Sequence, residues 1–129
     1  RSDPDYFYES CLLGWGGAKL SDFPIKHLTE YRKSWRNAET VRAMCDDYRA
    51  AIDFDFNLDT IDLSRRLDLP SLIMWGQDGA MDRAYDMSTV WKNRLSNLQT
   101  KAMPGGHFFP EISSEMTAEV LNSFLKSLE

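Results

Sequence analysis

The sequence of 129 residues contains little cysteine, and its cysteines stand alone. Cys11 and Cys45 are far apart and belong to no CxxC or Cys/His cluster. A disulfide framework or a structural zinc site is therefore not expected. We interpret both side chains as reduced thiols, which favours a cytoplasmic location. The sequence calls for no metal and no other cofactor.

Long apolar runs and an excess of positive charge are also missing. No apolar run approaches the roughly 18 residues of a transmembrane helix, and no basic segment precedes an apolar stretch as in a signal peptide. The formal net charge is −5. An acidic surface repels the phosphates of nucleic acids and the anionic headgroups of a membrane, so neither is an expected partner.

Several motifs that carry chemistry are absent. The sequence has no GxSxG nucleophile elbow, no GxGxxG, no Walker loop and no HExxH. The chain also begins at Arg1 without an initiator methionine and runs straight into a helix start. Together these features favour a segment cut from a longer protein that supplies a missing nucleophile.

The first part of the chain has the pattern of a helical unit. Asp3 and Pro4 form an N-cap followed by proline at the first helical position, and glycines at 14, 16 and 17 end that helix. Further helices open at 22–24 and 37–39, with apolar residues at three- and four-residue spacing. We expect residues 1–52 to be helical.

The second part alternates strands and helices. Residues 53–62 are acidic and predicted to be irregular. The expected elements are a short helix at 63–69, a buried strand at 71–75, a helix at 87–95, a strand at 98–103, a loop at 104–106 and a helix at 114–128. This order predicts an α/β fold, namely the end of a mostly parallel sheet with flanking helices. Two strands would leave long unpaired edges, so the N-terminal half of the protein has to complete the sheet.

His107 is the main candidate for chemistry. It follows the second predicted strand on the loop formed by Gly105 and Gly106, and functional groups in open α/β sheets lie beyond the carboxyl ends of strands. A histidine placed there can take a proton from water. The alternative is a loop histidine without a role. His27 lies in a predicted helix between Lys26 and Glu30, and we expect no function for it.

Asp78 is the candidate acidic partner of His107, because it follows the first predicted strand. The competing interpretation is a solvated carboxylate in an Asp-Gly turn. Asp82 and Asp86 are weaker candidates for the same role.

Tyr48 and Arg49 end the third predicted helix. A tyrosine hydroxyl or an arginine could hold an anion, whereas the plainer interpretation is that Tyr48 packs in a core and Arg49 pairs with an acid. Trp15 and Trp75 are expected to be packing residues.

Four segments, in this order and spacing, resemble the cap region of haloacetate (fluoroacetate) dehalogenases. They are residues 3–9 (DPDYFYE), 14–16 (GWG), 31–36 (YRKSWR) and 45–50 (CDDYRA). Residues 104–109 (PGGHFF) resemble the catalytic-histidine loop of the same family. The resemblance covers nearly the whole chain. It implies the C-terminal half of an α/β hydrolase, with part of a helical cap at 1–52 and core at 53–129.

The resemblance also implies a two-step hydrolysis of a small haloacid. An aspartate displaces the halide and forms an ester, which a histidine hydrolyses by activating water. His107 matches that histidine, and Tyr48 matches a tyrosine that binds the leaving halide. The family places the nucleophile, the substrate-binding arginines and the acidic partner before residue 1, which weakens the case for Asp78.

Other functions stay open at this point. Epoxide hydrolases and esterases use related scaffolds, and a truncated, inactive chain is a further alternative. The expected partners are a haloacid, water and the N-terminal half of the enzyme, with a homodimer left open.

Overall fold

The computed structural model describes residues 3–14 and 17–129. Its first part is helical, with α1 (Pro4–Gly14), a 3₁₀ turn η1 (Leu20–Asp22), α2 (Ile25–Trp35) and α3 (Ala38–Ala50). This confirms the three helices predicted from the sequence. The expectations for Trp15 and Gly16 lie outside the described residues.

The predicted caps open two of these helices. Asp3 Oδ1 accepts a hydrogen bond from the Tyr6 amide at 3.0 Å, with Pro4 as the first residue of α1. Asn37 Oδ1 accepts from the Glu39 amide at 2.8 Å at the start of α3. Each cap satisfies an amide that has no partner inside its own helix.

Helices α1 and α2 are joined by charged side chains from the segments that carry the family resemblance. Glu9 Oε1 accepts from Arg32 Nε at 2.8 Å, and Asp5 Oδ1 accepts from Trp35 Nε1 at 2.8 Å. Arg36 also pairs with Asp5. These contacts lower the pKa of Asp5 below its usual value, chiefly through the hydrogen bond from Arg36. The charged residues of segments 3–9 and 31–36 thus take part in the pairing of α1 with α2.

An apolar cluster lies between the helical unit and the end of the chain. Its buried members are Leu12, Phe23, Leu28 and Trp35. Phe108 and Ile112, from the segment after the second strand, pack against it. The helical unit and the C-terminal part therefore share a core.

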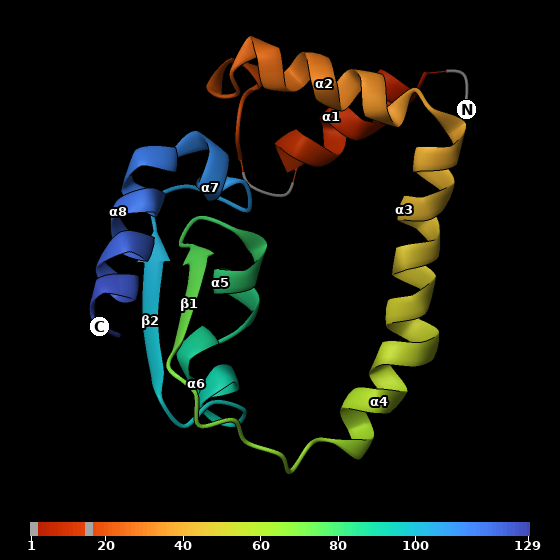
Figure 1. The fold of residues 1–129 in the computed structure, drawn as a ribbon. Coiled ribbons are helices and arrows are strands. Elements are labelled where there is room, and N and C mark those ends of the chain that lie inside the picture. Colours follow the sequence, from red (N-terminus) through yellow and green to blue (C-terminus); the bar gives the residue numbers. More distant parts are fainter. Residues whose placement is uncertain (1–2, 15–16) are drawn as a thin grey trace.

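Helix α3 continues without a break through a π-helical turn, η2 (Ala51–Asp55), into α4 (Phe56–Ile61). The prediction that 53–62 is irregular is therefore wrong. The short helix predicted at 63–69 is also wrong, because Leu67 instead pairs with Leu95 in a parallel bridge. The resulting rod, α3–η2–α4, stands apart from the strands over most of its length (Figure 1).

The described part of the chain contains a sheet of two parallel strands, β1 (Ser71–Gly76) and β2 (Leu98–Met103). Both strands match their predicted positions. Ser71 pairs with Leu98 and Gly76 with Met103, so the carboxyl ends of the strands lie level with each other. Figure 1 shows those ends pointing toward α1 and α2. Residues that follow the strands are therefore placed beneath the helical unit.

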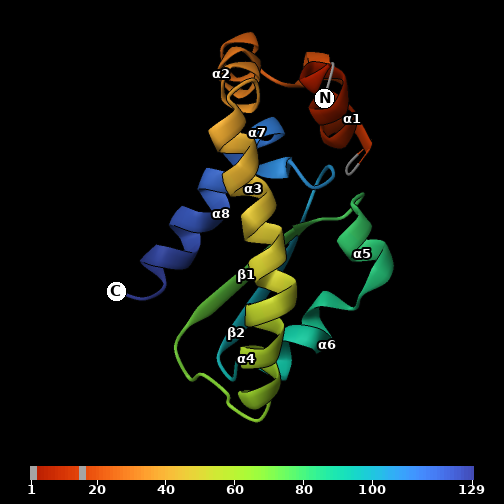
Figure 2. The same ribbon diagram turned by 90° about the vertical axis from the view of Figure 1, so that its right-hand side faces the viewer.

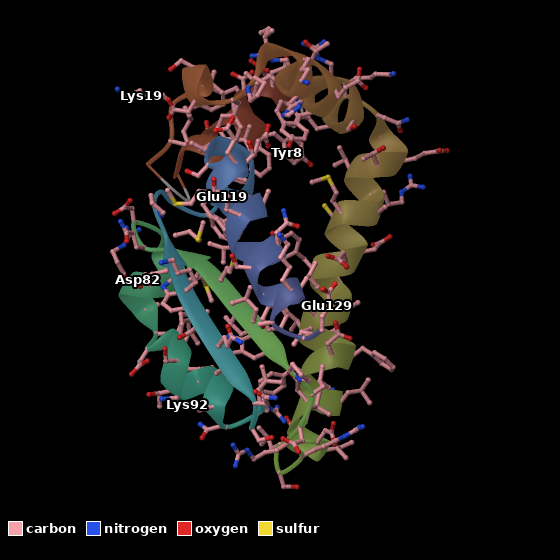
Figure 3. The ribbon with its side chains drawn as sticks, turned by 60° about the vertical axis from the view of Figure 1, so that its left-hand side comes forward. Tyr8, Lys19, Asp82, Lys92, Glu119 and Glu129 are labelled. Carbon is pink, nitrogen blue, oxygen red and sulfur yellow. The ribbon has the colours of Figure 1, made fainter. Side chains whose placement is uncertain are left out.

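Four helices accompany the strands. They are α5 (Ala80–Ala84), α6 (Met87–Lys92), α7 (Phe109–Ile112) and α8 (Ser114–Lys126). Figure 2 shows α5 and α6 on one side of the strands and α8 on the other, and Figure 3 places Asp82 of α5 and Glu119 of α8 accordingly. The predicted helices at 87–95 and 114–128 are confirmed with shorter ends, whereas α5 and α7 were not predicted.

The described residues contain neither a candidate membrane span nor a candidate metal cluster. In 3–14 and 17–129, no helix is long and apolar enough to cross a membrane. Within the same ranges, no group of three or more His, Cys, Asp or Glu side chains is arranged to hold a metal ion. Cys11 and Cys45 are free thiols.

Candidate active site

The loop after β2 is packed tightly against the end of β1. A Cβ atom added at Gly76 would lie 2.1 Å from the carbonyl oxygen of Gly106, a distance that no side chain can tolerate. Gly105 has a φ of +98°, which strongly favours glycine. Glycines at 76 and 105 therefore allow this loop to turn back across the neighbouring strand.

His107 lies at the carboxyl end of the sheet, as predicted. It directly follows Gly106, and its exposed ring contacts the edge of Phe108 with ring centroids 5.0 Å apart and an interplanar angle of 87°. The next residues form α7. The histidine is thus held between a tight glycine turn and a short helix. In this position an imidazole can exchange a proton with a molecule bound beyond the carboxyl ends of the strands.

Asp78 contacts the histidine loop through its backbone and its side chain. Its carboxylate Oδ2 accepts from the Gly105 amide at 3.0 Å, and its own amide donates to the Gly105 carbonyl at 3.0 Å. Arg83 donates to the Asp78 carbonyl at 2.8 Å. Asp78 thus holds the turn at Gly105, which lies two residues before His107.

The two weaker acidic candidates have structural contacts of their own. Asp82 Oδ1 accepts from the indole of Trp75 at 2.6 Å. Asp86 caps α6 by accepting from the amide and hydroxyl of Thr89, and these hydrogen bonds lower the pKa of Asp86. Both carboxylates thus hold local structure around α5 and α6.

An apolar cavity of about 560 Å³ lies between α1, α2 and α3 and next to the histidine loop. Tyr48 lines it from α3, and Phe108, the residue after His107, lines it from the loop. Tyr8 lies between the α1–α2 pair and α3 (Figure 3). The other lining residues are Phe7, Cys11, Leu12, Tyr31, Ser34, Trp35, Met44 and Cys45. The structure therefore places Tyr48 and the neighbour of His107 on one cavity, although they are 60 positions apart in sequence.

The Tyr48 side chain is not buried in a core in this structure, since the residue is 61% exposed. Arg49 pairs with Asp46 across one helical turn, which confirms the plainer interpretation of the arginine.

A cluster of His27, Tyr31 and Glu111, where α7 meets α2, was not predicted from the sequence. Glu111 of α7 bonds to His27 and Tyr31 of α2. The spacing of the two α2 residues could have indicated a shared polar site, because residues 27 and 31 are four positions apart and lie on the same face of a helix. Their acidic partner is about 80 residues away, and spacing alone does not reveal it.

Comparison with known proteins gives a consistent picture. No family model matches the chain. The chain is 43% identical over 124 residues to fluoroacetate dehalogenase from Burkholderia sp, which covers 96% of this chain and 41% of that protein. The chain thus spans about two fifths of this curated relative.

Solved structures share the fold. A protein from Nostoc sp PCC 7120, provisionally described as an alpha/beta hydrolase, superposes with a TM-score of 0.90 at 33% identity over 96% of this chain and 42% of that one. A provisionally described epoxide hydrolase mutant from Pseudomonas aeruginosa with bound MFA gives 0.83 at 27% identity, over 98% and 43% of the two chains. The chain has the α/β-hydrolase fold, and its sequence resembles the C-terminal portion of fluoroacetate dehalogenase.

Proposed function

We propose that the chain acts as the C-terminal part of a hydrolase that removes the halogen from a small 2-haloacid such as a haloacetate. The observation that carries this proposal is the 43% identity to fluoroacetate dehalogenase over 124 residues. The proposed partners are the haloacid, water and a preceding part of the polypeptide. We further propose that 1–52 belongs to the cap and 53–129 to the hydrolase core, with the rod α3–η2–α4 crossing between them.

The proposed reaction has two steps. An aspartate from the preceding part attacks the carbon that bears the halogen, so a C–O bond forms and the halide leaves with the electron pair of the C–halogen bond. His107 then takes a proton from water, whose oxygen attacks the ester carbonyl. The acyl C–O bond of the ester then breaks, and His107 gives its proton to the departing alkoxide, which leaves as the hydroxy acid. The carboxyl group of the nucleophile loses the remaining proton of the water to solvent and is again a carboxylate.

Tyr48 is proposed to stabilise the leaving halide. A hydroxyl that donates to an anion forms a charge-assisted hydrogen bond, and the cavity beside Tyr48 is lined mostly by apolar and aromatic side chains. Charge on the halide grows as the C–halogen bond breaks, so this donor would favour the transition state over the substrate.

The test is halide release by the longer enzyme that contains this chain. Fluoroacetate and chloroacetate should release halide with formation of glycolate, while a simple ester and an epoxide should be turned over at least about 100 times more slowly in kcat/KM, because a built substrate site loses that much when its polar groups are left unpaired. Preferred turnover of the epoxide would instead support the alternative that the similarity to the Pseudomonas protein raises. Turnover of the ester alone would contradict both proposals.

Substitution of Asp78 separates its two candidate roles. If Asp78 mainly holds the turn, Asp78→Asn keeps an oxygen acceptor for the Gly105 amide and leaves kcat within about threefold, whereas Asp78→Ala costs on the order of 1 kcal/mol of stability and lowers kcat further. If it orients His107 as an acidic partner, Asp78→Asn alone should lower kcat by about 10⁴-fold. Steady-state halide release and urea unfolding distinguish the outcomes, with Asp82→Asn as the matched control. We expect the first result.

A further inference from the structure

One carboxylate joins the histidine loop to the helical unit above it. Glu111 lies in α7, four residues after His107, and its side chain is 15% exposed. Its Oε1 is 2.8 Å from Nδ1 of His27, and its Oε2 accepts a hydrogen bond from the hydroxyl of Tyr31. Both partners belong to α2 and lie one helical turn apart. Each oxygen of the carboxylate is therefore held by the same cap helix.

The hydrogen bonds in this cluster are of the strong, charge-assisted type. The bond to Glu111, together with burial and the negative charge of Glu111, raises the pKa of Tyr31 to about 12. The phenol therefore keeps its proton at neutral pH and remains a donor. With His27 on its other oxygen, Glu111 has a defined place relative to α2.

Three backbone hydrogen bonds connect the segment around Glu111 with the histidine turn. The Phe109 amide donates to the Gly106 carbonyl, and the amides of Glu111 and Ile112 both donate to the Phe108 carbonyl, each at 3.1 Å. Phe108 and Ile112 also pack against the apolar cluster of the helical unit. A displacement of Glu111 is therefore transmitted to the peptide group that follows Phe108 and, through Phe109, to the peptide group between Gly106 and His107.

We propose that the cluster of His27, Tyr31 and Glu111 positions His107 for the second chemical step. It fixes the histidine loop relative to the cap. The imidazole of His107 is thereby kept within reach of the water molecule and of the ester. Asp78 holds the same loop from the side of β1. The inference rests on the proposed role of His107 as the base that activates water.

The test uses the longer enzyme with Glu111→Gln and Tyr31→Phe, and it measures each chemical step separately. A displacement of about 1 Å can cost 10²-fold in rate, so we expect Glu111→Gln to slow ester hydrolysis by about 10- to 100-fold. Halide release in the first turnover should stay within about threefold of wild type, and mass spectrometry should show the covalent ester accumulating. Tyr31→Phe should have the same effect, but smaller.

Two comparisons make the result specific. Glu30→Gln removes an exposed carboxylate from the same helix α2 and should leave both steps unchanged. The double variant Tyr31→Phe/Glu111→Gln should be no slower than Glu111→Gln alone, because both changes break one network. If Glu111→Gln gives little folded protein, Tyr31→Phe alone decides the outcome.

The proposal is overturned if Glu111→Gln and Tyr31→Phe leave ester hydrolysis unchanged. It is also overturned if both steps slow equally together with a lower melting temperature, since the cluster would then only stabilise the fold. The proposed function is judged separately by His107→Ala. Ester trapped in His107→Ala but absent in the cluster variants refutes the positioning role alone, whereas no ester in any variant refutes the mechanism.

Discussion

His107→Ala in the longer enzyme should stop the reaction after the halide has left and before the product is released. In the proposed mechanism His107 is the base that activates water, and the nucleophile belongs to another part of the polypeptide, so the substitution should affect only the second step. One equivalent of halide should therefore appear rapidly, and steady-state turnover should fall by about 10²- to 10⁴-fold, the usual contribution of a general base. Intact-protein mass spectrometry should detect the trapped ester, and a proteolytic digest should locate it on an aspartate outside this chain.

Added imidazole provides the control for His107→Ala. The substitution leaves a space of the size of an imidazole ring, which a small base can fill. Imidazole should restore ester hydrolysis in His107→Ala and should have no effect on wild type. Normal turnover without an adduct would show that His107 is not the base, and a complete loss of the halide burst would place its role in the first step instead.

Sequence patterns predicted the elements that depend on local chemistry. Asp3 and Asn37 are polar caps that act within three residues, and their helices begin where expected. The strand at 71–76 has an apolar run between proline and glycine, and the strand at 98–103 ends directly before Pro104 and Gly105; both were recognised. His107 was placed correctly beyond a strand because its position depends only on the end of β2.

The rod α3–η2–α4 could not be predicted by periodicity, for a physical reason. A π-helical turn at Ala51–Asp55 takes more residues per turn than an α-helix, so the apolar side chains before and after it fall out of the α-helical repeat. Ile52, Phe54 and Phe56 are also more than 60% exposed, and no buried face sets their spacing within the described residues. The acidic sequence at 53–62 therefore has no helical periodicity, although it is part of a continuous helix.

Contacts between residues that are far apart in the sequence could not be predicted either. The glycine at 76 has a clear purpose only when Gly106 is placed next to it, and Glu111 gains a partner only when α2 is placed over α7. These pairs join residues that neither helical nor strand spacing relates. The part of the candidate site that the resemblance predicted, His107 and Tyr48, stays a prediction that kinetics has to test.

Tyr48→Phe should weaken dehalogenation selectively according to the halide. The phenol hydroxyl is the only group removed, and Tyr48 lies on the apolar cavity next to Phe108. A hydrogen bond to a charged group contributes about 1.5–3 kcal/mol, which corresponds to about 10- to 150-fold in kcat/KM. Fluoride is the smaller anion with the more concentrated charge, so it needs a donor more than chloride does as the bond breaks. The loss should therefore be greater for fluoroacetate than for chloroacetate.

Stopped-flow release of fluoride and chloride in a single turnover is the measurement that isolates this step. Tyr6→Phe, at a tyrosine of α1 that is 75% exposed and does not line the cavity, removes the same hydroxyl and should leave both rates unchanged. Equal losses for the two substrates would mean that Tyr48 shapes the cavity without binding the halide. A loss confined to ester hydrolysis would instead assign the hydroxyl to the step that His107 carries out. Only a fluoride-selective loss in the first step ties Tyr48 to the leaving group, because that step alone places new negative charge on the halide.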